Sequence, residues 1–131
     1  MPAATILSDI KITDMTTVIF GPYCTQTLAD MGADVIKLEP PQGDMMRYGG
    51  KPANTRGMGP MHMTINRGKR SVALDQKSDM GKEATRKLIE TSDVFIHNVR
   101  ESSIKRLNLT FDEVKAIKPV SYTHLTLPTK A

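Results

Sequence analysis

The sequence contains a single cysteine, Cys24, no tryptophan, and few aromatic residues of any kind. One cysteine cannot form a disulfide within the chain or a cysteine-based zinc site, and this usage is typical of a reducing compartment. Aromatic residues make up 5% of the chain, and the basic residues form no long run, so the net charge of +4 does not by itself indicate nucleic-acid binding. An anionic small ligand explains that charge equally well.

Long apolar runs are also missing. No stretch approaches the length of a membrane span, and Met1–Asp9 has neither the basic start nor the apolar centre of a signal peptide. We therefore expect a cytoplasmic protein that does not bind membranes. His62, His97 and His124 are scattered without the spacing of metal ligands, so we expect no metal site. Cys24 falls among apolar residues of an expected helix and is interpreted as a packed thiol.

The stretch from residue 18 to residue 39 organises the rest of the chain. The β-branched run Val18–Phe20 predicts the end of a first strand, and Pro22 suits the first position of a helix that follows it. Gly32 suits the left-handed residue after that helix, and residues 35–38 form a second apolar run. This pattern predicts a βαβ unit. Its helix N-terminus lies beside the carboxyl end of a strand, where open α/β sheets bind ligands.

The remaining chain alternates between strand and helix patterns. Residues 71–75 and 93–96 are expected strands, and residues 40–68 are expected to form a long ordered loop. Further helices are expected at residues 80–91, 103–107 and 110–117, the first capped by Ser78 or Asp79 and the last by a Thr110–Glu113 capping box. Residues 120–131 show no caps and do not complete the next strand that this alternation requires. The whole predicts an α/β fold with a parallel sheet and flanking helices.

Two groups of polar residues are candidate contacts for an anion. The first is Arg67, Lys69 and Arg70 together with Lys77, for which a solvated surface turn is the alternative. The second follows the carboxyl end of the expected strand at 93–96 and comprises Asn98, Arg100, Lys105 and Arg106. The glycine fingerprint of dinucleotide-binding proteins is absent, which argues against NAD. The spacing of Asp14, Asp34 and Asp44 does not mark a general acid/base pair.

Four motifs then carry a resemblance. They read GPxCTQxLADMGADVIKLE, GDxxR, NRGKRSVxLD and DVFIxN, and they lie in this order at residues 21–39, 43–47, 66–75 and 93–98. Together they closely resemble the N-terminal segment of the class III CoA-transferases, the CaiB/BaiF family. The resemblance covers about residues 7–119. It implies that residues 1–119 are the N-terminal, Rossmann-like, CoA-binding part of such a protein.

The resemblance also implies a site and partners. Coenzyme A or an acyl-CoA would be bound as a substrate, with a carboxylic acid as acceptor, no prosthetic group, and an interlocked homodimer as the assembly. The matching CoA contacts in this sequence are Thr17, Val18, Ile19, Leu74, Lys77, Asn98, Arg100, Arg106 and Leu107. Three positions depart from the family pattern. Pro40 replaces an arginine found in some members, and His97 and Val99 replace a common glutamate and aromatic residue.

The resemblance also implies that the catalytic residue of the family is not in this chain. Transferases of the family use an aspartate that attacks the acyl-CoA thioester, and that aspartate lies beyond the motif ending near Pro119. We therefore expect this chain alone to be inactive. Residues 120–131 do not resemble the family, and our hypothesis is that they are a non-native tail. Two alternatives stay open: a fragment of an α-methylacyl-CoA racemase of the same family, or a noncatalytic nucleotide-binding subunit.

Overall fold

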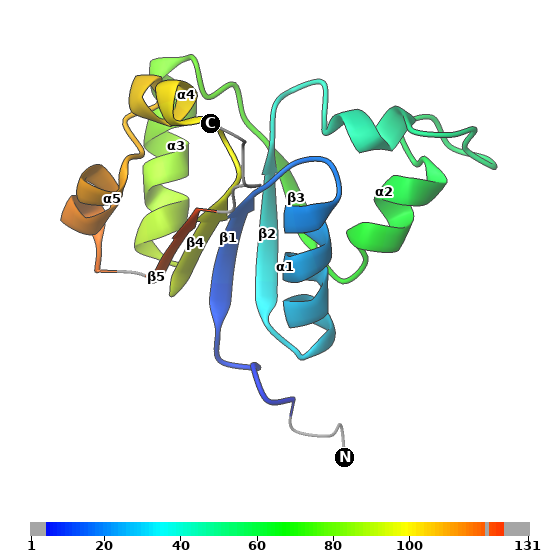
Figure 1. The fold of residues 1–131 in the computed structure, drawn as a ribbon, viewed down its shortest axis with the longest axis horizontal. Coiled ribbons are helices and arrows are strands. Elements are labelled where there is room, and N and C mark those ends of the chain that lie inside the picture. Colours follow the sequence, from blue (N-terminus) through cyan, green and yellow to red (C-terminus); the bar gives the residue numbers. More distant parts are fainter. Residues whose placement is uncertain (1–4, 120, 125–131) are drawn as a thin grey trace, which may run out of the picture.

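Five parallel strands form one sheet in the order β3-β2-β1-β4-β5, with helices between them (Figure 1). The structure is a computed structural model that describes residues 5–119 and 121–124. The elements, in chain order, are β1 Lys11–Met15, α1 Phe20–Asp30, β2 Asp34–Glu39, the 3₁₀ helix η1 Met45–Tyr48, α2 Pro60–Ile65, β3 Arg70–Ala73, α3 Asp79–Glu90, β4 Val94–His97, α4 Glu101–Arg106, α5 Phe111–Ile117 and β5 Ser121–His124. The predicted α/β class with a parallel sheet is confirmed.

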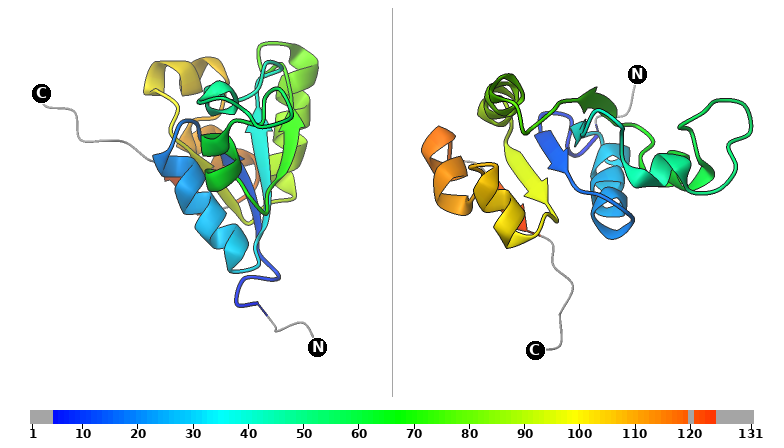
Figure 2. Two further views of the ribbon diagram at one scale, coloured as in Figure 1. Left: turned by 90° about the vertical axis from the view of Figure 1, so that its right-hand side faces the viewer. Right: turned by 90° about the horizontal axis from the view of Figure 1, so that it is seen from above.

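The helices cover the sheet from both sides. Helices α1 and α2 lie on one face, and α3, α4 and α5 lie on the other (Figures 1 and 2). On the α3 side, Met15, Leu38 and Phe95 pack with Ile89 and Val114 in an apolar core. On the α1 side, a smaller apolar core lies toward the amino ends of the strands.

The α1 side changes character along the strands. Ile12 and Val35, which are register partners, belong to the apolar core. Two residues further on, the same two strands place Asp14 beside Lys37, and both are buried. Because side chains alternate along a strand, Asp14 and Lys37 point to the α1 side while Met15 and Leu38 point to the α3 side.

The local signals predicted from the sequence are present. Gly32 follows α1 with a φ of 100°, in the left-handed region. Gly81 N donates to Ser78 Oγ over 3.0 Å, so Ser78 caps α3. The capping box at Thr110 opens α5, with Thr110 N donating to Glu113 Oε2 over 2.9 Å. These caps satisfy backbone N–H groups that the first turn of a helix leaves without partners.

The prediction of a strand at Val18–Phe20 is wrong. Strand β1 ends at Met15, Val18 has a φ of 71°, and Phe20 is already the first residue of α1. Pro22 is therefore the third helical residue and not the first. The cause is a side chain: Thr16 N donates to Asp14 Oδ1 over 2.9 Å, and this bond turns the chain away from the sheet.

Two further predictions need correction. Residues 40–68 are not a single loop, because Asp44 caps η1 by accepting from Met46 N and Pro60 begins α2. Residues 121–124, expected not to form a strand, pair with β4 in parallel register. The structure does not describe residues 120 and 125–131, and the non-native origin of 120–131 stays a hypothesis.

Candidate functional site

A cleft of about 970 Å³ opens at the carboxyl ends of the strands. Its walls come from the carboxyl ends of four adjacent strands and the segments after them. They are formed by Met15 at the end of β1 and Thr17 after it, Pro40–Gln42 after β2, Leu74–Lys77 after β3, and the β4–α4 region from Val99 to Leu107. Parallel sheets leave such a depression where connections diverge to opposite faces, so the position is the one expected for a ligand in this fold class.

Five of the nine predicted contact residues line this cleft. They are Thr17, Leu74, Lys77, Arg106 and Leu107. They come from three separate parts of the chain, and only the fold brings them together.

The other four residues lie next to the cleft or away from it. Val18 and Ile19 follow Thr17 in an exposed turn. Asn98 supports that turn, because Thr17 N donates to Asn98 Oδ1 over 3.0 Å and Asn98 Nδ2 donates to Thr17 O over 2.9 Å. Arg100 is exposed at the N-cap of α4 and is not among the residues that line the cleft.

The cleft combines apolar walls with positive charge. Leu38, Leu74 and Leu107 supply apolar surface, whereas Lys77, Lys82 and Arg106 supply three cations. Asp75 is the one carboxylate among the lining residues. Ammonium and guanidinium groups make strong, charge-assisted hydrogen bonds to phosphate oxygens. The cleft is therefore suited to a ligand that carries several phosphates and an apolar or aromatic part.

Lys82 was not identified from the sequence. It lies in α3, four residues after the cap Ser78, and faces the same cleft as Lys77. One signal could have identified it: in a parallel α/β sheet, the first turn of a helix that follows a strand lies at the ligand-binding edge.

Of the first group of candidate cations, only Lys77 lines the cleft. Lys69 is buried on the α1 side, where its Nζ lies 2.9 Å from Asp14 Oδ2 and 2.8 Å from Asn66 Oδ1. Arg67 and Arg70 form ion pairs with Asp30 and Asp34 at the surface. Both predictions are therefore wrong for Lys69, which is neither a phosphate contact in the cleft nor part of a solvated surface turn. The turn after α2 directs its side chain beneath α1.

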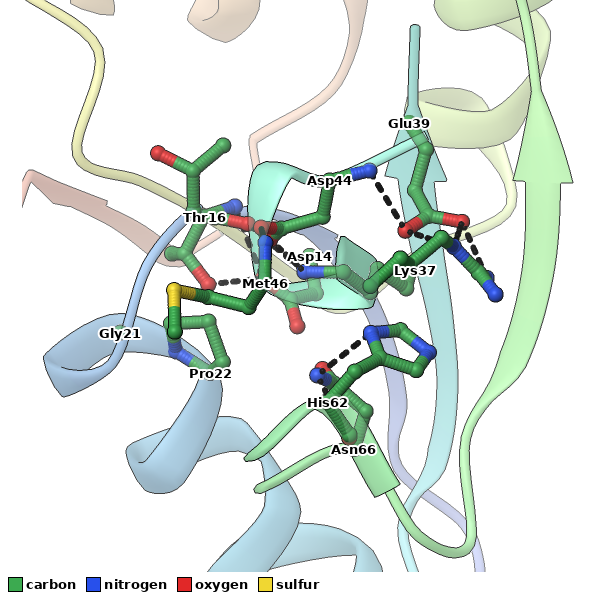
Figure 3. Close-up of polar contacts among 12 residues, drawn as sticks. Asp14, Thr16, Gly21, Pro22, Lys37, Glu39, Asp44, Met46, His62 and Asn66 are labelled. Atoms are coloured by element: carbon green, nitrogen blue, oxygen red, sulfur yellow. Dashed lines mark hydrogen bonds and ion pairs between the residues drawn. The ribbon is translucent and has the colours of Figure 1, made fainter. Parts of the chain in front are cut away.

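A buried ionic network lies on the α1 side of the sheet (Figure 3). Asp14 Oδ2 accepts from Lys69 Nζ and from Thr25 Oγ1. Lys37 Nζ lies 3.0 Å from Asp44 Oδ2 and donates to Thr16 O over 2.9 Å. The side chains of Lys37, Asp44, Lys69 and Asp14 are each at most 1% exposed. Burial of charges is costly unless each charge is paired and hydrogen-bonded. Each of these four charges has an ionic partner, although Asp44 Oδ2 makes no hydrogen bond with the described residues.

A third pair extends the network to η1. Arg47 Nη2 donates to Glu39 Oε2 over 2.6 Å, and Ser71 Oγ donates to the same oxygen. Burial raises the pKa of Glu39, but the hydrogen bonds from Arg47 and Ser71 outweigh it and lower the pKa to about 2. Burial also lowers the pKa of the Lys69 ammonium, against the opposing effect of Asp14.

The histidines are structural in the described part of the chain. His62 is buried beside Asn66, and burial lowers its pKa. His97 and His124, expected to be scattered, stack with ring centroids 4.4 Å apart. Among residues 5–119 and 121–124, no three His, Cys, Asp or Glu side chains are grouped so as to hold a metal ion.

Cys24 packs against the apolar core of the α1 side, as expected. None of the helices in these residues is long and apolar enough to cross a membrane.

Comparison with known sequences identifies related proteins. The family model described as CoA-transferase family III matches residues 7–121. A formyl-CoA:oxalate CoA-transferase of Streptomyces coelicolor is 42% identical over 117 residues, which is 88% of this chain and 28% of the relative. A succinyl-CoA:mesaconate CoA-transferase of Haloarcula hispanica is 36% identical over 116 residues, which is 86% of this chain and 29% of the relative.

Comparison with solved structures also identifies similar proteins. A CaiB/BaiF family protein from Brucella suis superposes with a TM-score of 0.86 at 35% identity, over 91% of this chain and 33% of that protein. The protein Rv3272 from Mycobacterium tuberculosis superposes with a TM-score of 0.84 at 31% identity, over 94% of this chain and 34% of that protein. The chain thus spans about a third or less of the length of these relatives.

Proposed function

Because the chain belongs to CoA-transferase family III, we propose that its cleft binds the nucleotide part of coenzyme A. The observation that carries this proposal is the convergence of Lys77, Lys82 and Arg106 on one cleft with apolar walls. Coenzyme A combines phosphates, which suit the cations, with an adenine ring and a pantetheine arm, which suit the leucine surfaces. Thr17, Leu74 and Leu107 complete the proposed contacts in the cleft, and Val18, Ile19 and Asn98 form and support its rim.

For the whole protein we propose transfer of CoA from an acyl-CoA to a carboxylic acid. The names of the two relatives found by sequence support this class, since both are described as CoA-transferases. The proposed mechanism passes through an aspartyl intermediate on a residue outside this chain. We accordingly propose that residues 1–119 bind CoA without transferring it. An interlocked homodimer and a cytoplasmic location are part of the same proposal.

The test is titration calorimetry of the chain with CoA and with pantetheine, which lacks the nucleotide. We expect CoA to bind and pantetheine to bind far more weakly. Lys77→Ala or Arg106→Ala should weaken CoA binding at least tenfold, because each removes a charge-assisted bond worth about 1.5 to 3 kcal/mol. The matched control is Lys87→Ala, since Lys87 lies exposed on α3 and pairs with Glu83. Equal binding of CoA by all these variants would contradict the proposal.

A further inference from the structure

Lys37 is an unusual residue for the middle of a central strand. Its side chain is 1% exposed and carries a charge into the interior on the α1 side of β2 (Figure 3). A buried ammonium group is costly and is tolerated only where its hydrogens meet well-placed acceptors. The identity of those acceptors shows what the charge achieves here.

The Lys37 ammonium joins two loops. Its Nζ donates to Thr16 O over 2.9 Å and lies 3.0 Å from Asp44 Oδ2. Thr16 belongs to the β1–α1 loop and directly precedes Thr17, which lines the cleft. Asp44 belongs to the β2–η1 loop, and Pro40–Gln42 of the same loop line the cleft. Lys37 therefore contacts Thr16 and Asp44, whose loops form two adjacent walls of the cleft. It does not line the cleft itself.

Other residues fix each loop separately. Asp14 bonds Thr16 in the first loop through its Oδ1, and Asn98 bonds Thr17. In the second loop, Asp44 N donates to Glu39 Oε1 over 3.2 Å. Lys37 contacts both loops, through a hydrogen bond to Thr16 O and an ion pair with Asp44. It is therefore placed to set their separation. The first loop also holds Val18 at a φ of 71°, a strained conformation that persists only where surrounding contacts enforce it.

We propose that Lys37 is a positioning residue for the CoA cleft. Its ammonium group holds the β1–α1 and β2–η1 loops at the separation that the nucleotide requires, so that CoA meets walls that are already ordered. A preformed site binds more tightly because the ligand does not bear the cost of ordering the loops. This inference rests on the proposed function of the cleft and assigns the Lys37–Asp44 pair a role in it.

The test removes both charges of the pair together. Lys37→Met with Asp44→Asn avoids leaving one buried charge without its partner. The matched control is Asp34→Asn with Arg70→Met, which removes another ion pair of β2 at the amino end of the strand, away from the cleft. Calorimetry measures the Kd for CoA, and hydrogen exchange measures the protection of the backbone amides of residues 15–19 and 42–46.

We expect the Lys37/Asp44 double variant to bind CoA at least tenfold more weakly, with faster exchange in both loops and unchanged exchange in α3. The control should match the unchanged protein in all three respects. A folded Lys37/Asp44 variant whose Kd stays within threefold of the unchanged protein would overturn the inference. If the unchanged chain does not bind CoA while the loops still lose protection in the variant, the proposed function fails and the structural link between the loops stands.

Hydrogen exchange on the unchanged protein covers the case in which the double variant does not fold. If Lys37 joins the loops, they should open together, with similar protection factors, and CoA should protect both. Independent opening of the two loops, or protection of only one of them by CoA, would overturn the inference.

Discussion

On the α3 side of the sheet, Met15, Leu38 and Phe95 are buried among apolar side chains, whereas on the α1 side Asp14 and Lys37 are buried in ion pairs. Apart from Phe95 of β4, the two sets come from the same strands, since Asp14 precedes Met15 and Lys37 precedes Leu38. The two sides therefore differ in how they contribute to the free energy of folding. Apolar burial is favourable for each residue, but a buried ion pair returns little beyond the desolvation that it costs.

The two sides of the sheet therefore make different contributions to the structure. The α3 side supplies the larger apolar core and the floor of the cleft, which Met15 and Leu38 line. The α1 side supplies directional contacts that fix the loops at the carboxyl ends of the strands. Ion pairs and hydrogen bonds specify position in a way that apolar contacts do not, because their energy depends on the placement of particular atoms.

The largest effect should come from the α3 side. Phe95 is fully buried in β4, and Phe95→Ala should lower the free energy of unfolding by about 3 to 5 kcal/mol, through lost burial and the cavity left behind. Urea denaturation followed by circular dichroism measures the change. Phe20→Ala is the matched control, because Phe20 is 67% exposed and its removal should change stability by less than about 1 kcal/mol. Similar decreases in the free energy of unfolding of the two variants would contradict an apolar core on this side.

On the α1 side, the cost should depend on whether one charge or both are removed. Asp14→Asn leaves the Lys69 ammonium buried without its carboxylate and should destabilise the protein by about 3 kcal/mol. Adding Lys69→Met should recover most of that loss, because no buried charge then lacks a partner. Urea denaturation of the three variants gives the coupling free energy.

The control for this cycle is an exposed pair. Asp34 and Arg70 form an ion pair in which both side chains are more than a third exposed, and Asp34→Asn should cost less than about 1 kcal/mol. Additive losses for Asp14→Asn and Lys69→Met, with no recovery in the double variant, would mean that the two residues act independently.

The comparison also explains which features the sequence could predict. Strands β2, β3 and β4 and the caps at Ser78 and Thr110 were predicted because short apolar runs, alternation and capping are local signals. The end of β1 was not predicted. Val18 and Ile19 favour strands locally, but the backbone there is decided by hydrogen bonds that Thr16 N and Thr17 N donate to the side chains of Asp14 and Asn98.

The residues of the candidate site, too, could be predicted only where a local motif marks them. Lys77 and Arg106 were found through motif resemblance, and both line the cleft. The ionic network was missed because its partners are distant in sequence: Asp14 and Lys69 are 55 residues apart, and only strand pairing and the α2 turn bring them together. A charged residue two positions after a buried one in the same expected strand, as Lys37 follows Val35, is the signal that could have indicated it.

The smallest effect we predict is a pH dependence of stability caused by His97. His97 lies on the α3 side, fully buried, with Nε2 2.6 Å from Tyr122 Oη and Val99 N donating to Nδ1. Burial, together with the neighbouring His124, lowers the pKa of His97 to about 4 from its ordinary 6.5. The unfolded chain therefore binds a proton at a higher pH than the folded protein, so stability falls as pH falls from 6.5 toward 4.

Between pH 7.5 and pH 5 the loss from His97 should be about 2 kcal/mol. Glu39, on the α1 side, acts in a different window: its pKa of about 2 means that its stabilising contribution is lost only as pH falls from 4.5 toward 2. Urea denaturation at a series of pH values measures the loss of stability in each of the two pH windows. His97→Gln should reduce the slope above pH 5, where His62 also contributes because burial lowers its pKa, and should leave the slope below pH 4.5 in place. Tyr122→Phe should keep most of the upper slope, because burial is the main cause of the shift. If His97→Gln leaves that slope unchanged, His97 does not titrate in this window and the α3 side contributes no pH dependence through it.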